Sequence, residues 1–300
     1  MIHTLDYRIH QVAGYINWLY FFHAWQFPSR YGSIAQVHGC TACRQNWLQQ
    51  FPAEERVRAQ EAMRLYDDAC RMLREQEDRG ITTHFRFALL EANSRGDDIV
   101  VEGGVVLPFL RQQVAQEGAP CLCLSDFVRP LSRGIPDRIG VFVSTVDEGM
   151  ECQYPEDAYR HMLCQTLADR LAEATAECGH QEVRQHIWAY APDEHLTVEE
   201  LFAERYVGKR PAVGYPNMPD QSLNFILSRL LDFPSLPVRL TEHGAMLPHA
   251  STSGLMLAHP ATCHFSVGTV GADQFRDYAA RRGVSEQWLR PFLLSSLAAE

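Results

Sequence analysis

The chain has 300 residues, of which 46% are hydrophobic and 21% charged, as is ordinary for a globular protein with a full core. Its formal net charge of −10 argues against non-specific binding to nucleic acid or to an anionic membrane. No apolar run approaches the roughly 20 residues that cross a bilayer, and the start MIHTLDYRIH is too polar for a secretion signal. With nine cysteines, an odd number, we expect a cytoplasmic protein whose thiols are mostly reduced and buried.

The first half of the chain predicts an aromatic cluster, a long helix and several strands. The aromatic side chains between Tyr15 and Phe27 favour a core cluster over a ligand wall. Apolar residues recur at three- and four-residue spacing from Ala59 to Leu73, which predicts an amphipathic helix between Pro52 and Gly80. β-branched and aromatic residues predict strands, which are expected over 81–92, twice within 98–108, and over 138–145.

The second half predicts more helix than strand. Apolar residues at helical spacing predict a long helix over 155–185. Shorter helices are expected over 198–206, 222–231, 273–282 and 285–294, and short strands over 255–257 and 263–269. Because strands and helices alternate irregularly, the pattern favours an α+β fold over a doubly wound sheet. No repeat or linker stands out, so we expect one domain over residues 1–300.

The segment 208–219, GKRPAVGYPNMP, joins a long-reach cation to a stiff backbone and an aromatic ring. Pro211 steers Arg210 toward an extended conformation, and each proline fixes its own φ. Gly214 permits the close approach of a ligand or another segment, and Tyr215 adds a flat face with a hydroxyl. A guanidinium on an ordered loop suits a carboxylate, so this turn could hold a small zwitterion with an aromatic part. The alternative is a surface loop with one solvated arginine.

The sequence HGCTAC places His38, Cys40 and Cys43 close together. A C-x-x-C pair can bind a metal or cycle between thiol and disulfide. A structural zinc site needs about four ligands, and no second pair with matching spacing appears, so ordinary buried cysteines are the favoured alternative. The chain has no phosphate-binding loop, dinucleotide fingerprint, His-Glu-x-x-His or nucleophile elbow, which gives little support to a self-contained hydrolase, kinase or dehydrogenase.

A set of segments follows in order along nearly the whole chain, namely YINWLYFF (15–22), GDDIVVEG and FLRQQ (between 96 and 113), CLSDFVRP (123–130), LADRLAEATAE (167–177), IWAYAPDEHLTVEEL (187–201) and RPAVGYP (210–216), followed by LTEHGAM, HASTSG and HP. This ordered set resembles the activation domain of cobalamin-dependent methionine synthase. HGCTAC is an addition to this pattern. The resemblance implies a single C-shaped α+β domain around a long, twisted antiparallel sheet flanked by helices.

The resemblance also implies a function. The family's activation domain holds S-adenosylmethionine above cobalamin, a reduced flavoprotein such as flavodoxin supplies one electron, and the methyl group moves to cobalt. At 300 residues the chain leaves no room for homocysteine-, folate- or cobalamin-binding modules. We therefore expect the activation part of a methyltransferase of methionine biosynthesis, not a complete enzyme. Its cobalamin would come from a separate methionine synthase or corrinoid protein.

The resemblance further implies the residues that contact S-adenosylmethionine. Arg210 would bind its carboxylate, the backbone of Ala212 its adenine, and Glu173 would reach it from the long helix. Gly214 and Tyr215 would shape the loop. For Glu173, a solvated helix face is the alternative.

Two expected ligand positions depart from the family pattern. Asn17 stands where the family has an aspartate, which removes a negative charge, and His264 stands where it has a tyrosine. Two other functions stay open. One is a partner-binding module of the same fold with an altered ligand, and the other is a thiol or metal protein that uses the HGCTAC residues.

Overall fold

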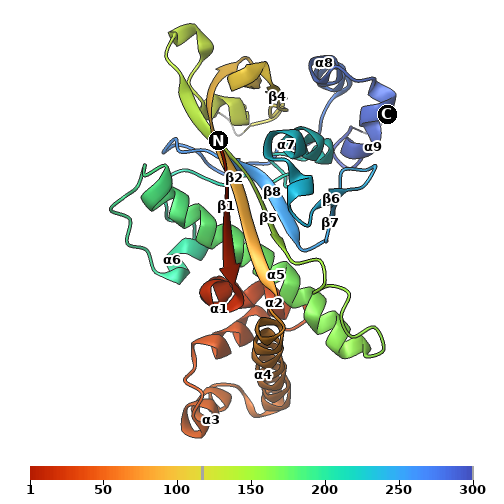
Figure 1. Ribbon diagram of the computed structural model, residues 1–300. Coiled ribbons are helices and arrows are strands. Elements are labelled where there is room, and N and C mark those ends of the chain that lie inside the picture. Colours follow the sequence, from red (N-terminus) through yellow and green to blue (C-terminus); the bar gives the residue numbers. More distant parts are fainter. Residues whose placement is uncertain (116–117, 299–300) are drawn as a thin grey trace.

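The computed structural model describes residues 1–115 and 118–298, and its framework is a six-stranded antiparallel sheet (Figure 1). The strand order is β4-β3-β2-β5-β8, and β1 also pairs with β2. The strands of this sheet are β1 (Ile2–Arg8), β2 (Thr82–Arg95), β3 (Asp98–Val101), β4 (Val106–Pro108), β5 (Asp137–Val146) and β8 (Ser251–Met256). A separate two-stranded ribbon consists of β6 (Arg239–Leu240) and β7 (Met246–Leu247).

Two long helices, α4 and α5, dominate the helical part, as the apolar spacing predicts. The helices are α1 (Ile9–Val12), α2 (Trp18–Ala24), α3 (Thr41–Gln49), α4 (Arg56–Asp78), α5 (Ala158–Glu182), α6 (Val198–Phe202), α7 (Asn224–Leu231), α8 (Ala272–Arg282) and α9 (Glu286–Leu293). Within the described residues, no helix combines the length and the apolar character that a membrane span requires.

The sheet buries both faces because side chains alternate along each strand. Phe85 and Phe87 of β2 pack with α5 on one face, whereas Ala88 and Leu90 pack with α7 on the other. The helix α5 lies very close to the sheet at Gly179, where an added Cβ would stand 2.4 Å from the Phe85 ring. This close packing fixes the position of α5, which carries the acidic residues of the candidate site.

The aromatic N-terminal segment forms a second core below the sheet. Phe21 and Phe22 of α2 are fully buried and belong to a hydrophobic cluster with residues of α4 and α5. The prediction of a core cluster is confirmed for these rings. Tyr20, in contrast, is 62% exposed and lines a groove described below.

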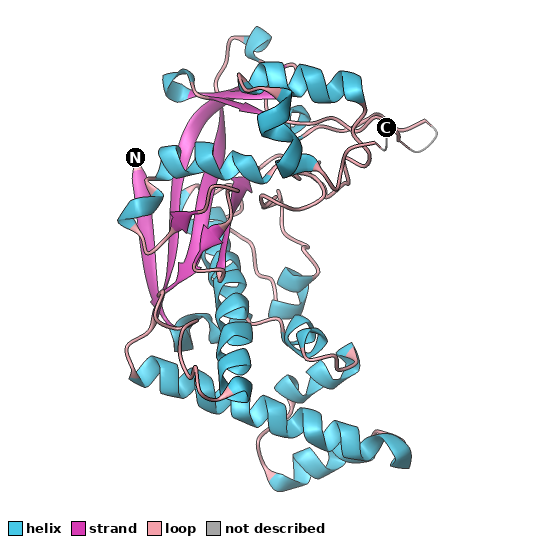
Figure 2. Cartoon of the chain, turned by 90° about the vertical axis from the view of Figure 1, so that its right-hand side faces the viewer, coloured by secondary structure: helices cyan, strands magenta, loops and turns pink. Residues whose placement is uncertain are grey.

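The structure confirms the α+β class and the twisted antiparallel sheet with flanking helices. Figure 2 shows helices at both ends of the sheet projecting to the same side, which gives the expected C shape. The strand predicted over 263–269 is wrong, because the described residues there pair with no strand. Instead, the Val267 N–H donates to the carbonyl of Pro216 at 2.9 Å, so this segment is a loop tied to another loop.

Candidate functional site

The arginine-bearing turn begins as an extra extended segment on the outer edge of β8. The N–H of Lys209 donates to the carbonyl of Leu257 at 2.9 Å, and the N–H of Leu255 donates to that of Pro211 at 2.9 Å. Alternate residues of an antiparallel pair bond to the neighbouring strand. The main-chain groups of Arg210 therefore point away from β8, as do those of Ala212.

Glycines make this close pairing possible. An added Cβ on Gly254 of β8 would stand 2.1 Å from the carbonyl oxygen of Pro211. Gly208 has a φ of +76°, and its Cβ would meet the carbonyl oxygen of Leu257 at 2.2 Å. Gly214 has a φ of +89°, a left-handed conformation that favours glycine. Its N–H donates to the carbonyl of Met218 at 2.9 Å and closes the turn.

The turn forms the lip of a groove of about 520 Å³ between α2, α5, α6 and β8. Six of the seven residues expected at the ligand line this groove together, namely Asn17, Glu173, Arg210, Ala212, Tyr215 and His264. Gly214 shapes the lip but does not line the groove. Residues that are 247 positions apart at the extremes of this set thus come to one place (264 − 17).

Arg210 pairs with Glu177 rather than with Glu173. Its Nη1 and Nη2 both lie 3.3 Å from Oε2 of Glu177, and the two side chains are only 13% and 10% exposed. Burial alone would lower the pKa of the Arg210 guanidinium, but Glu177 together with Tyr206 and Glu173 outweighs it and raises the pKa. The alternative of a solvated arginine is therefore wrong. Glu173 instead accepts from the Tyr215 hydroxyl at 3.4 Å.

A fully buried histidine, His180, also contacts the guanidinium of Arg210. The Nδ1 atom of His180 lies 2.8 Å from Nη1 of Arg184 and 3.2 Å from Nη1 of Arg210. Because a guanidinium can only donate, Nδ1 accepts and the proton lies on Nε2, which faces the Tyr190 hydroxyl at 3.3 Å. Burial and the neighbouring guanidinium groups lower the pKa of His180 well below its usual value, so the ring stays neutral.

The second oxygen of Glu177 is free to accept from a bound molecule. Oε1 is buried and has no hydrogen-bond partner among the residues that the structure describes. Such an atom is costly unless a ligand or water satisfies it. Since Glu177 lines the groove beside Arg210, the pair presents a cation and a spare anionic acceptor to the same space.

The groove is also lined by the two positions that depart from the family pattern. Asn17 caps α2, since its Oδ1 accepts from the N–H of Leu19 at 3.1 Å. His264 lies with its Nε2 at 3.0 Å from Oε2 of Glu204. Burial alone would raise the pKa of Glu204, but the contact with His264 and the nearby cations lower it. Glu204 therefore adds a carboxylate to the groove.

Sequence reasoning missed several groove residues. Asp169, Glu173 and Glu177 form an acidic row with four-residue spacing on the long helix. This spacing was the one indication in the sequence that Glu177 lies on the same helix face as Glu173. Glu204 gave no signal in the sequence, and the spacing of Arg170 indicated only a possible ion pair with Glu173 on the long helix. Tyr15 and Tyr20, which also line the groove, belong to the aromatic segment that was expected to be core.

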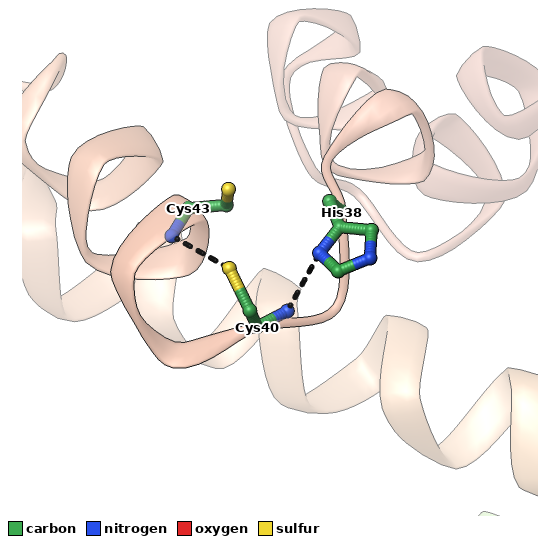
Figure 3. Close-up of side chains that lie close together, drawn as sticks. All are labelled: His38, Cys40 and Cys43. Atoms are coloured by element: carbon green, nitrogen blue, oxygen red, sulfur yellow. Dashed lines mark hydrogen bonds between the residues drawn. The ribbon is translucent and has the colours of Figure 1, made fainter.

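His38, Cys40 and Cys43 lie outside this groove, at the start of α3 (Figure 3). All nine cysteines have free thiols in the described chain, but only Cys123 and Cys164 are buried. The expectation that most cysteines are buried is wrong, because several stand at helix starts or in surface loops. A hydrogen bond with His38 lowers the pKa of the exposed Cys40 thiol to about 6.

The fold and the groove define a binding module for a small zwitterion. The groove offers the buried guanidinium of Arg210, the carboxylate oxygen of Glu177 that has no partner among the described residues, and the rings of tyrosine side chains. The family model described as vitamin B12 dependent methionine synthase, activation domain, matches residues 8–283, and the chain belongs to this family. The chain is also similar to a crystal structure of the MetH reactivation domain bound to AdoHcy. The identity is 32%, the match covers 100% of this chain and 91% of that one, and the TM-score is 0.85.

Proposed function

We propose that this chain binds S-adenosylmethionine in the groove and supports the reductive remethylation of cobalamin held by a partner. One observation carries the proposal, namely the buried pair of Arg210 and Glu177 with a spare Oε1. An amino-acid head group needs a guanidinium for its carboxylate and an acidic oxygen for its ammonium. The pair offers both within one groove.

The remaining groove residues suit the rest of the molecule. Three carboxylates, from Glu173, Glu177 and Glu204, stand against two guanidinium groups, from Arg170 and Arg210. This acidic balance suits a sulfonium cation. The rings of Tyr15, Tyr20 and Tyr215 offer flat faces for an adenine, and the outward main chain of Ala212 can bond its edge.

The chain's own residues bind and orient in this proposal, and none is assigned as a catalytic acid or base. S-adenosylmethionine supplies an electrophilic methyl group when bound. The family supports a cobalamin-binding partner. We further propose that this partner is a methionine synthase or another corrinoid protein, that a flavodoxin-like protein is the reductant, and that the chain works in the cytoplasm as one domain over residues 1–300.

A second candidate is a partner-binding module that has lost or changed its ligand. It draws support from Asn17, whose oxygen is used by the cap of α2 and which carries no charge. His264 is likewise held by Glu204. Under this second candidate the groove keeps its shape but does not bind S-adenosylmethionine.

Calorimetry on the full chain separates the two candidates. We expect binding of S-adenosylmethionine and of its demethylated product at one site. Arg210→Lys keeps the charge but loses the guanidinium fork, and we expect at least about tenfold weaker binding, which corresponds to about 1.4 kcal/mol. The matched control is Arg239→Lys at the surface, where the side chain is 69% exposed. No binding heat from folded protein at millimolar ligand would reject the proposal and favour the second candidate.

The partner is tested separately. A native pull-down is expected to recover a corrinoid protein, and this protein should gain methylcobalamin only when the chain, S-adenosylmethionine and a reductant are all present. Binding of S-adenosylmethionine without any methylation of the recovered partner would contradict the role in remethylation while leaving the ligand assignment in place.

A further inference from the structure

Three soft ligand groups converge at the start of α3, and none of them lines the groove. One ligand atom each from His38, Cys40 and Cys43 lies within 4.8 Å of the other two. Figure 3 shows the imidazole and both thiols gathered around the first turn of the helix. Two of the three groups are only three residues apart, while the histidine comes from the loop that precedes the helix.

The surrounding structure holds these groups in place. Arg44, next to Cys43, forms two hydrogen bonds of 2.6 Å with Asp67 of α4. Trp47, one turn further along α3, is only 2% exposed, and its indole N–H donates to the Ser33 hydroxyl at 2.9 Å. The first turn of α3 is therefore anchored on the helix that follows and on the segment that precedes it. Binding of an ion would require little rearrangement.

The two contacts that backbone N–H groups make within the cluster are weak. The N–H of Cys43 lies 3.4 Å from Sγ of Cys40, and the N–H of Cys40 lies 3.4 Å from Nδ1 of His38. The contact with nitrogen is long for a hydrogen bond, and a thiol sulfur is a weak acceptor, so both ligand atoms stay available to a stronger partner. Tetrahedral Zn²⁺ with bonds of about 2.0–2.3 Å places its ligand atoms roughly 3.5–4 Å apart. Since the ligand atoms already lie within 4.8 Å of one another, they need to approach by no more than roughly 1 Å.

We propose that His38, Cys40 and Cys43 form a binding site for a soft divalent cation of the Zn²⁺ class. Two thiolates and one imidazole are the ligand types that such ions prefer. Three protein ligands leave a fourth position, and Cys40 is exposed, so this position opens to water or to a donor from a partner. The site does not depend on the proposed function of the groove, because none of the three residues lines it.

The convergence of the histidine favours a metal site over a redox-active thiol pair. A disulfide between Cys40 and Cys43 would use the two sulfurs alone and give the imidazole no role. A metal ion uses all three groups. A stable disulfide is therefore the competing outcome of the experiment.

Metal titration of the full chain tests this site. The reduced, chelator-treated protein is titrated with Co²⁺ as a spectroscopic probe and then with Zn²⁺ in competition with a chromophoric chelator. We expect one equivalent of Co²⁺ with thiolate charge-transfer absorption and the intense visible bands of tetrahedral coordination. Zn²⁺ should displace it. No uptake by the reduced protein would overturn the proposal.

Variants of the ligands locate the bound ion. Cys43→Ser and His38→Ala should each weaken Co²⁺ binding beyond the roughly 10–100-fold that loss of an outer hydrogen-bond partner costs. Cys152→Ser and Cys263→Ser remove exposed thiols outside the cluster and should leave binding unchanged. Circular dichroism checks that each variant is folded. Two outcomes would contradict the assignment. One is an unchanged Co²⁺ absorption spectrum in Cys40→Ser/Cys43→Ser, and the other is a Cys40–Cys43 disulfide that re-forms while the reduced chain takes up no metal.

Discussion

The groove and the cluster at the start of α3 both gather polar groups, but they hold them differently. In the groove, Arg210 is 13% exposed, lies 3.3 Å from Glu177, and is backed by the buried His180. At α3, Cys40 is exposed, and the contacts among His38, Cys40 and Cys43 are 3.4 Å long. Removing Arg210 leaves the buried Glu177 carboxylate without its cation, whereas removing the exposed Cys40 leaves no buried charge unpaired. We therefore expect substitutions of the buried groove pair to lower the stability of the fold, and substitutions in the cluster at α3 to leave it nearly unchanged.

The largest expected effect comes from Arg210→Ala. This variant leaves Glu177 buried without its cation, and we expect the free energy of unfolding to fall by about 3–5 kcal/mol. Urea unfolding measures the loss. The matched control is Arg239→Ala, because the pair of Arg239 and Glu148 is exposed and should contribute no more than about 1 kcal/mol. Equal losses in the two variants would remove the contrast between buried and exposed groups.

A glycine comparison gives the next largest effect. Gly254→Ala forces a Cβ against the Pro211 carbonyl oxygen, and overpacking of this kind costs about 1–3 kcal/mol. The lip of the groove should shift, so ligand binding should weaken as well. Gly39→Ala, within the loop before α3, meets nothing within 4 Å and should be close to neutral. Thermal unfolding of both variants checks this. A neutral Gly254→Ala would show that the lip is not held by the close pairing.

The pH dependence of stability reports on His180. An unfolded histidine titrates near pH 6.5, whereas His180 stays neutral to much lower pH in the folded protein. The unfolded state thus binds an extra proton below about pH 6.5, and stability falls by up to about 1.4 kcal/mol per pH unit until the folded pKa is reached. The stability advantage of the wild type over His180→Gln should therefore shrink as the pH falls below about 6.5.

Two other histidines are relevant to that measurement. The hydrogen bond with Asp147 raises the pKa of His84, so its contribution is present in acid and is lost as the pH rises. This opposite trend cancels in the difference between the wild type and His180→Gln. His243→Gln is the control, since the His243 side chain is 74% exposed. A difference that is flat with pH would show that His180 is not held neutral.

The smallest effect is expected at α3. Without metal, Cys40→Ser/Cys43→Ser should change the free energy of unfolding by less than about 0.5 kcal/mol, because the exposed thiol of Cys40 lies in a weakly bonded cluster. Denaturant unfolding in the presence of a chelator measures this. A loss above about 2 kcal/mol would mean that the thiols support the fold, and the two regions would no longer differ.

Local patterns predicted the helices and strands that form from neighbouring residues. Apolar spacing located α4 and α5, and paired glycines located β3 and β4. The strand β1 was missed because it shows little burial alternation and is defined by its pairing with β2, some 80 residues away (Ile2 with Ala88, Arg8 with Thr82). The segment over 263–269 has strand-like residues but finds no edge to pair with, since Lys209–Val213 occupies the edge of β8.

The candidate site was predictable only in part for the same reason. The sequence around Arg210 indicates a stiff turn with a cation, and the family resemblance adds Glu173, Ala212 and Asn17. Glu177 was missed because a carboxylate on a long helix is usually solvated. Its burial depends on Arg210, which lies 33 positions further along the chain (210 − 177). Only the folded arrangement reveals such a pair.

The lip of the groove has a further consequence for how this protein behaves in solution. Strand β8 is the last in the order of the sheet, and Lys209–Val213 bonds along its outer side. An uncovered outer strand invites pairing with another chain. Anything that lifts the lip, whether a substitution or a poorly fitting ligand, would therefore promote self-association as well as loss of binding. The turn proposed to receive the ligand thus also covers the outer side of this strand.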